Sequence, residues 1–104
     1  MKISVKGTTY NVERVDDIEN SPTAIGRTMP KKKKIEFVEC EISEYETLCT
    51  IIHELMHAYL YETGVRLLEQ EEEFCYWIES VFIEMQQNLK KIAKKYGYNP
   101  EVKQ

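Results

Sequence analysis

The sequence predicts an α+β fold in which a short antiparallel sheet of about three strands packs on two helices. Three observations support this prediction. Apolar and polar residues alternate in parts of the first 40 positions, the apolar period changes to three and four from residue 43, and the chain has only 104 residues. A chain of this length forms one hydrophobic core, so we expect a single domain spanning residues 1–104.

The strands are expected in the N-terminal 40 residues. Apolar and polar residues alternate over 3–5, Gly7 supplies a turn, and a second apolar pattern covers 10–15, which together indicate a hairpin. The segment 26–30 contains Gly26 and Pro30 and is predicted to be a loop. Residues 35–39 are rich in β-forming side chains and predict a short third strand.

Two helices are expected after the strands. Ser43 and Glu46 have the spacing of a capping box, and Gly64 is a typical stop, so the first helix is predicted over about 43–63. A second helix is predicted over about 69–96, lying along the core for its full length. Its apolar stripe consists of Phe74, Ile78, Val81 or Phe82, Met85, Leu89, Ile92 and Tyr96.

Composition excludes several classes of function. Lys and Arg number 14 against 18 Asp and Glu, a net charge of −4, which disfavours nucleic-acid binding because phosphates require a basic surface. No apolar run approaches the roughly 20 residues of a membrane span, and residues 1–6 do not form the apolar block of a secretory signal. The three cysteines, Cys40, Cys49 and Cys75, form no CxxC pair. We therefore expect a cytoplasmic protein without nucleic-acid or membrane partners.

The chemistry of this chain is expected at His53, Glu54 and His57, which form an HExxH motif inside the first predicted helix. Residues four apart lie on one helical face, so the two imidazoles can converge on a single zinc ion. The adjacent Glu54 carboxylate can then take a proton from a water that the zinc has acidified. The motif uses both histidines of the chain.

A catalytic zinc site needs a third protein ligand, and the chain has no third histidine. The second helix begins with a cluster of glutamates. Glu71 lies about 35° from the centre of the apolar stripe at 100° per residue, whereas Glu72 and Glu73 lie more than about 100° away. A carboxylate on the core side is costly unless it is paired or metal-bound, so Glu71 is the predicted third ligand. Glu72 remains an alternative, and Cys75 at the edge of the stripe could offer a thiolate.

The stretch from about Ser43 to Met85, which contains the motif and a glutamate-led amphipathic helix, resembles the small gluzincin-type zinc metallopeptidases. It looks most like the ImmA/IrrE-like proteins and the short HExxH proteins of phages and prophages. The resemblance implies a minimal zincin-like fold with zinc held by His53, His57 and a glutamate of the following helix. It also implies that Glu54 is the general base.

The function we predict is therefore zinc-dependent hydrolysis of a peptide bond in a protein or peptide substrate. The strand 35–39 is expected to hold extended substrate by edge pairing. Two other hypotheses stay open at this point. The chain could be a non-catalytic zinc-binding or protein-interaction module of a phage or prophage element, or a structural helical protein in which the motif occurs by chance.

Overall fold

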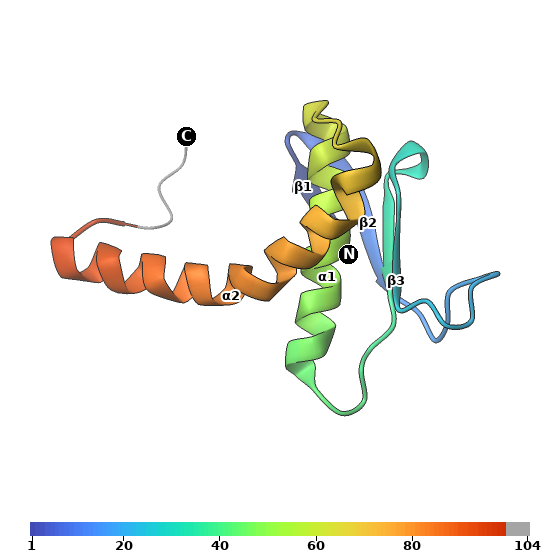
Figure 1. Ribbon diagram of the computed structural model, residues 1–104, viewed down its shortest axis with the longest axis horizontal. Helices are drawn as coiled ribbons and strands as arrows, with labels where there is room; N and C mark the ends of the chain where they lie inside the picture. Colours follow the sequence, from blue (N-terminus) through green and yellow to red (C-terminus); the bar gives the residue numbers. More distant parts are fainter. Residues whose placement is uncertain (100–104) are drawn as a thin grey trace.

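The computed structural model describes residues 1–99 and places a four-stranded sheet beside two helices (Figure 1). The strands are β1 (Lys2–Val5), β2 (Thr8–Arg14), β3 (Gly26–Met29) and β4 (Lys34–Phe37), in the order β1-β2-β4-β3. The α+β class is confirmed. The sheet is mixed rather than antiparallel throughout, because β2 and β4 run parallel between two antiparallel pairs.

The fourth strand lies where the sequence predicts a loop. Residues 26–29 form β3, and the 3₁₀ turn η1 (Pro30–Lys32) returns the chain into β4. This corrects the expectation that the strand near residues 35–39 has a free edge, because β4 is an interior strand between β2 and β3. The exposed edge on this side of the sheet belongs to β3, a strand that carries no alternating apolar pattern by which its sequence could reveal it.

The helix α1 (Glu44–Thr63) begins and ends as predicted. The Ser43 hydroxyl accepts a hydrogen bond from the Glu46 backbone N–H at 3.3 Å, and Gly64 ends the helix with a φ of 73°. The helix packs on the sheet through Ala58, which has no exposed surface and forms the core with Val5, Tyr10 and Ile35. A residue as small as alanine at this contact lets the helix backbone approach the strands closely. The middle of α1 thereby lies beside β3 and β4.

The second helix, α2 (Glu71–Tyr96), follows the 3₁₀ turn η2 (Leu68–Gln70) and ends at Gly97. Only its first half packs on α1, where Cys75 and Ile78 are buried. The second half extends away from the rest of the fold (Figure 1). The prediction that this helix follows the core for its full length is therefore wrong, because α2 crosses α1 and leaves it after a few turns. Within residues 1–99, neither helix combines the length and the apolar character needed to cross a bilayer.

Candidate metal and catalytic site

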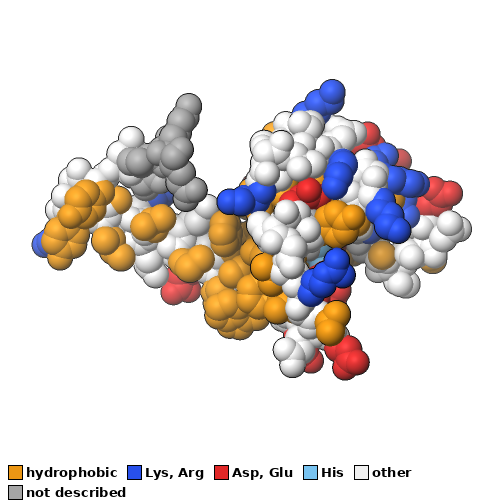
Figure 2. Space-filling view, turned by 90° about the horizontal axis from the view of Figure 1, so that it is seen from above, with side chains coloured by type: hydrophobic (Ala, Val, Ile, Leu, Met, Phe, Trp, Pro, Cys, Tyr) orange, Lys and Arg blue, Asp and Glu red, His pale blue; other side chains and the backbone are white. Residues whose placement is uncertain are grey.

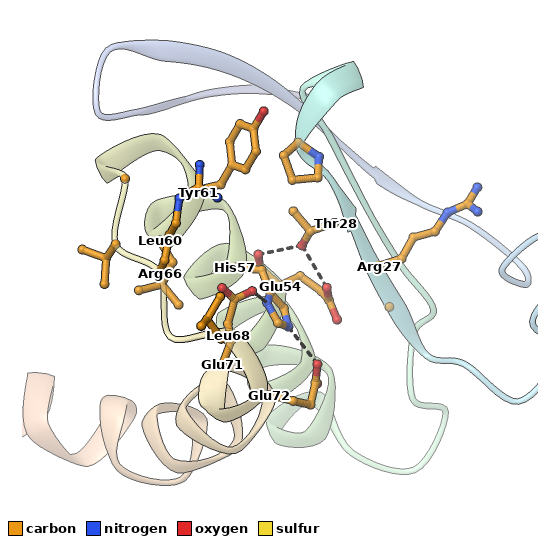
Figure 3. Close-up of a pocket in the computed structure, with 14 residues that line it drawn as sticks. Arg27, Thr28, Glu54, His57, Leu60, Tyr61, Arg66, Leu68, Glu71 and Glu72 are labelled. Carbon is orange, nitrogen blue, oxygen red and sulfur yellow. Dashed lines mark hydrogen bonds and ion pairs between the residues drawn. The ribbon is translucent and has the colours of Figure 1, made fainter.

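The HExxH residues lie in the middle of α1, at the place where α2 crosses it. His53 and Glu54 are only 6% and 8% exposed, because β3 covers one side of them and α2 the other. The His53 and His57 rings have centroids 5.0 Å apart. The first turns of α2 bring Glu71 and Glu72 against the His57 ring (Figure 3), and Glu72 also contacts His53.

The Nε2 atoms of both histidines face the carboxylate of Glu72. Nε2 of His53 lies 2.5 Å from one oxygen of Glu72, and Nε2 of His57 lies 3.3 Å from the other. Two ligands of a tetrahedral zinc, each about 2.05 Å from the metal, lie about 3.3 Å apart. The contact of Glu72 with His57 has the separation of two metal ligands, and a shift of the exposed Glu72 side chain would lengthen the shorter contact with His53.

The Nδ1 atoms of the same two rings contact two further glutamates, Glu71 and Glu79. Nδ1 of His57 lies 2.7 Å from Glu71, and Nδ1 of His53 lies 2.9 Å from Glu79. An N–H donated to a carboxylate at Nδ1 leaves the lone pair of a neutral imidazole at Nε2. Metal-binding histidines are characteristically oriented in this way by a carboxylate behind the ring. In the tautomer with the proton at Nδ1, both rings direct a free electron pair toward Glu72.

This arrangement concentrates negative charge. Four carboxylates, those of Glu54, Glu71, Glu72 and Glu79, surround two imidazoles, and within residues 1–99 none of the four pairs with Lys or Arg. In the tautomer with the proton at Nδ1, two lone pairs and a carboxylate face one another, and they repel unless a cation lies between them. The donor set of two imidazoles and one carboxylate matches that of a catalytic zinc.

Glu54 belongs to the same helix, and its carboxylate contacts β3 while lining the same hollows as Glu72. The Thr28 hydroxyl lies 2.9 Å from its carboxylate and 2.7 Å from its backbone carbonyl, and it donates to these oxygens (Figure 3). Burial raises the pKa of the Glu54 carboxyl above its ordinary value, and the Thr28 hydrogen bond partly opposes that effect. The result is a carboxylate fixed in position and more basic than an exposed one.

Gly26 is the position that lets β3 pass so close to α1. A Cβ at this residue would lie 3.0 Å from Cγ of Glu54 and 3.0 Å from a methyl group of Thr50. Contacts this short require the neighbouring side chains to move. The absence of a side chain at Gly26 is therefore a condition for the observed place of Glu54.

Cys75 lies beneath the histidines and is fully buried. Its sulfur and one nitrogen of each histidine all lie within 4.8 Å of one another, which makes a second possible set of metal ligands. Burial, followed by the charges of Glu71 and other nearby glutamates, raises the pKa of the Cys75 thiol to about 12. Without a metal the sulfur is therefore a neutral thiol.

A cleft runs along β3 on both sides of the site. One hollow of about 770 Å³ is lined by His57, Glu71 and the apolar residues Leu60, Val65 and Leu68. A second hollow of about 760 Å³ lies beyond His53. The two meet at Gly26, Glu54 and Glu72, which line both. The site thus stands in the middle of an open groove whose wall is the free edge of β3.

The structure brings the predicted residues His53, Glu54, His57 and Glu71 together, and it adds Glu72 and Glu79, which the helical-wheel argument did not select. The helical wheel averaged apolar residues over both halves of α2, and those of the second half, Met85, Leu89, Ile92 and Tyr96, face solvent. On the half that packs, Glu72 and Glu79 lie seven residues apart, two turns along one ridge. Thr28 and Gly26 carried no signal in the sequence because their role depends on a strand pairing between distant segments.

Comparison of this chain with protein-family models, with curated proteins and with solved structures found no match.

Proposed function

We propose that this protein is a zinc-dependent hydrolase of peptide bonds, in which His53, His57 and Glu72 hold the metal and Glu54 is the general base. The observation that carries the proposal is the orientation of the two imidazoles. Both Nε2 atoms converge on one carboxylate while both Nδ1 atoms are held by others. Histidines that merely pack on a helix face have no need of this double constraint.

The third ligand is the point at which this proposal departs from the prediction of Glu71. Glu71 contacts the Nδ1 side of His57, which is the position of a residue that orients a ligand. Glu72 faces the Nε2 atoms of both rings. We therefore assign ligation to Glu72 and orientation to Glu71 and Glu79.

Zinc bound to such a site polarises a carbonyl group and acidifies a water molecule. The protein contributes the rest. Glu54 is positioned to accept a proton and return it to the leaving amine, and its raised pKa favours both transfers at neutral pH. Thr28 fixes the carboxylate, and the packing of β3 and α2 keeps bulk water from the buried side of the site.

The substrate we propose is an extended segment of polypeptide lying along β3. The outer edge of β3 has backbone N–H and C=O groups that are not used by β4, and the two hollows continue the groove in both directions. An extended peptide can satisfy those groups by adding a strand. The edge pairing predicted for residues 35–39 is thereby reassigned to residues 26–29.

The test compares Glu54→Gln with Glu73→Gln, which removes the same charge from an exposed position at the start of α2. We expect both variants to bind one zinc ion per chain, and only Glu54→Gln to lose hydrolysis of an unstructured protein substrate such as casein, by a factor of about 100 or more. Unchanged hydrolysis in zinc-loaded Glu54→Gln would exclude Glu54 as the base. A wild-type protein that binds no zinc would exclude the proposal as a whole.

One observation favours a second function, that of a non-catalytic zinc module. If the Cys75 sulfur joins the two histidines and Glu72, the metal has four protein ligands and no open position for water, as in structural zinc sites. Cobalt substitution separates the two functions. An intense thiolate-to-cobalt absorption band that disappears in Cys75→Ser supports the closed site, whereas its absence from the wild type supports the open, catalytic site.

The resemblance to small gluzincins, including the ImmA/IrrE-like and phage-encoded proteins, agrees with the catalytic proposal. It implies the same HExxH roles and a glutamate ligand from the next helix. A cytoplasmic location is part of the same proposal.

A further inference from the structure

The second half of α2 presents an apolar stripe to solvent. We call residues 85–96 the arm; at 1.5 Å per residue it is about 18 Å long. Along one face of the arm, Met85 is 51% exposed, Leu89 54%, Ile92 55% and Tyr96 66%. Figure 1 shows the arm extending beyond the sheet and α1, and Figure 2 shows hydrophobic side chains following it.

Nothing in the proposed catalytic function uses the arm. None of its residues lines either hollow of the cleft in the described part of the chain. An isolated helix end of this length is marginal in water, and helices gain most of their stability by burying an apolar face. The spacing of three and four residues between the apolar side chains is that of a surface that packs on another helix.

The two halves of α2 carry charges of opposite sign. Residues 71–84 contain five glutamates and no basic residue, and residues 85–96 contain four lysines and no acid. The lysines are Lys90, Lys91, Lys94 and Lys95. Two copies of α2 packed in parallel would bring eight lysines together, whereas two antiparallel copies would place the lysines of each near the glutamates of the other.

We propose that the arm is the interface of a homodimer in which two α2 helices pack antiparallel about a two-fold axis near residue 87. With this axis, Met85 lies opposite Leu89 of the partner subunit, and Phe82 lies opposite Ile92 of the partner subunit. Each contact occurs twice by symmetry. The segment 90–95 then faces segment 79–84 of the partner, and Lys90 lies opposite the exposed Glu84 of the partner subunit. The arrangement covers Met85, Leu89 and Ile92 and places opposite charges together at Lys90 and Glu84.

An anionic membrane is the other surface that a lysine-bearing amphipathic helix can bind. The charges disfavour it here. The same helix has five glutamates over residues 71–84, and the whole chain has a net charge of −4, so an anionic surface would repel the body to which the arm is attached. A second copy carries both signs and matches them.

The first test measures the oligomeric state of the full chain by sedimentation equilibrium over a range of concentrations. We expect a reversible dimer whose dissociation constant rises at least about tenfold in Leu89→Glu and in Ile92→Glu, because each introduces two unpaired carboxylates into the apolar seam. The matched control is Gln87→Glu, which adds the same charge about half a turn away from the stripe and should leave the constant within about twofold. Helical content by circular dichroism must be equal in all variants.

The second test measures orientation. Spin labels at Gln87 would lie on the outer faces of the two helices at the level of the axis, so pulsed electron resonance should give a distance set by the lateral separation of the labels alone. Labels at Lys94 should be separated by a further axial distance of about 21 Å in the antiparallel dimer and by none in a parallel one, from the rise of 1.5 Å per residue. A monomer at all concentrations, equal dissociation constants in Leu89→Glu and Gln87→Glu, or a monomer that binds anionic lipid vesicles through the arm would each overturn the proposal. The arm variants should leave the zinc content unchanged, because the arm contributes no residue to the proposed metal site. A failure of the dimer proposal can therefore be distinguished from a failure of the catalytic proposal.

Discussion

The assignment of the third zinc ligand rests on a difference of one residue between Glu71 and Glu72, and it can be tested by changing each to glutamine. Glu71→Gln keeps an oxygen at the position 2.7 Å from Nδ1 of His57, so it weakens the support of a ligand without removing it. Glu72→Gln replaces the carboxylate that faces both Nε2 atoms with a neutral amide, which is a poor zinc ligand.

The magnitudes follow from these two positions. Loss of a group that orients a metal ligand lowers affinity by about 10- to 100-fold. Because glutamine still accepts the hydrogen bond, Glu71→Gln should lower the zinc affinity by the smaller end of this range, about tenfold or 1.4 kcal/mol. Glu72→Gln removes a proposed ligand itself and should lower the zinc affinity by more than the larger end of this range, over about 100-fold or 2.8 kcal/mol.

The assay is competition for zinc between the metal-free protein and a chromophoric chelator of known affinity at pH 7. Glu73→Gln is the control, since it removes an exposed charge from the same turn of α2. A larger loss of affinity in Glu71→Gln than in Glu72→Gln would refute the assignment and restore Glu71 as the ligand. Equal and small losses in both variants, with a large loss in Cys75→Ser, would assign the third position to the thiolate.

Three further outcomes are expected. Gly26→Ala should destabilise the fold by about 1–3 kcal/mol in urea unfolding and lower hydrolysis, because the new methyl group lies 3.0 Å from the Glu54 side chain; unchanged stability would contradict the close approach of β3. Thr28→Val should move the acidic limb of the activity profile to higher pH, because it removes a hydrogen bond that lowers the Glu54 pKa; a shift to lower pH would contradict that role. The Glu62 pKa is lowered chiefly by its hydrogen bond from Lys33, so this carboxylate stabilises the fold above its ordinary pKa of 4.5 and the contribution is lost as pH falls through the lowered value. Glu62→Gln should therefore be less stable than the wild type at pH 7 and equally stable near pH 2, and a difference that persists at pH 2 would argue against it.

The helix boundaries could be predicted from the sequence because local chemistry sets them. A hydroxyl at Ser43 satisfies a backbone N–H of the first turn, and Gly64 adopts a positive φ that other residues avoid. The HExxH spacing is equally local, since residues four apart share a helical face whatever surrounds them. These features need no knowledge of the neighbouring segments.

The sheet could be predicted only in part. The β1–β2 hairpin has a local turn at Gly7 and an alternating pattern, and it forms as expected. The edge strand β3 has neither signal, because Gly26 and Thr28 are selected by what lies across from them on α1. An interaction partner that is 26 residues away, as Glu54 is from Thr28, leaves no periodicity in the sequence.

The sequence by itself determined the chemical type of the candidate site: two imidazoles on one face of a capped helix with a carboxylate beside them, followed by a helix that begins with glutamates. The tertiary structure decided which glutamate faces the Nε2 atoms of both histidines, which strand forms the wall of the cleft and how much of α2 belongs to the core. The physical reason is that α2 crosses α1 rather than running beside it. A crossing helix contacts its neighbour over a few turns only, so an apolar stripe averaged over all 26 residues of α2 does not indicate the face that those turns present.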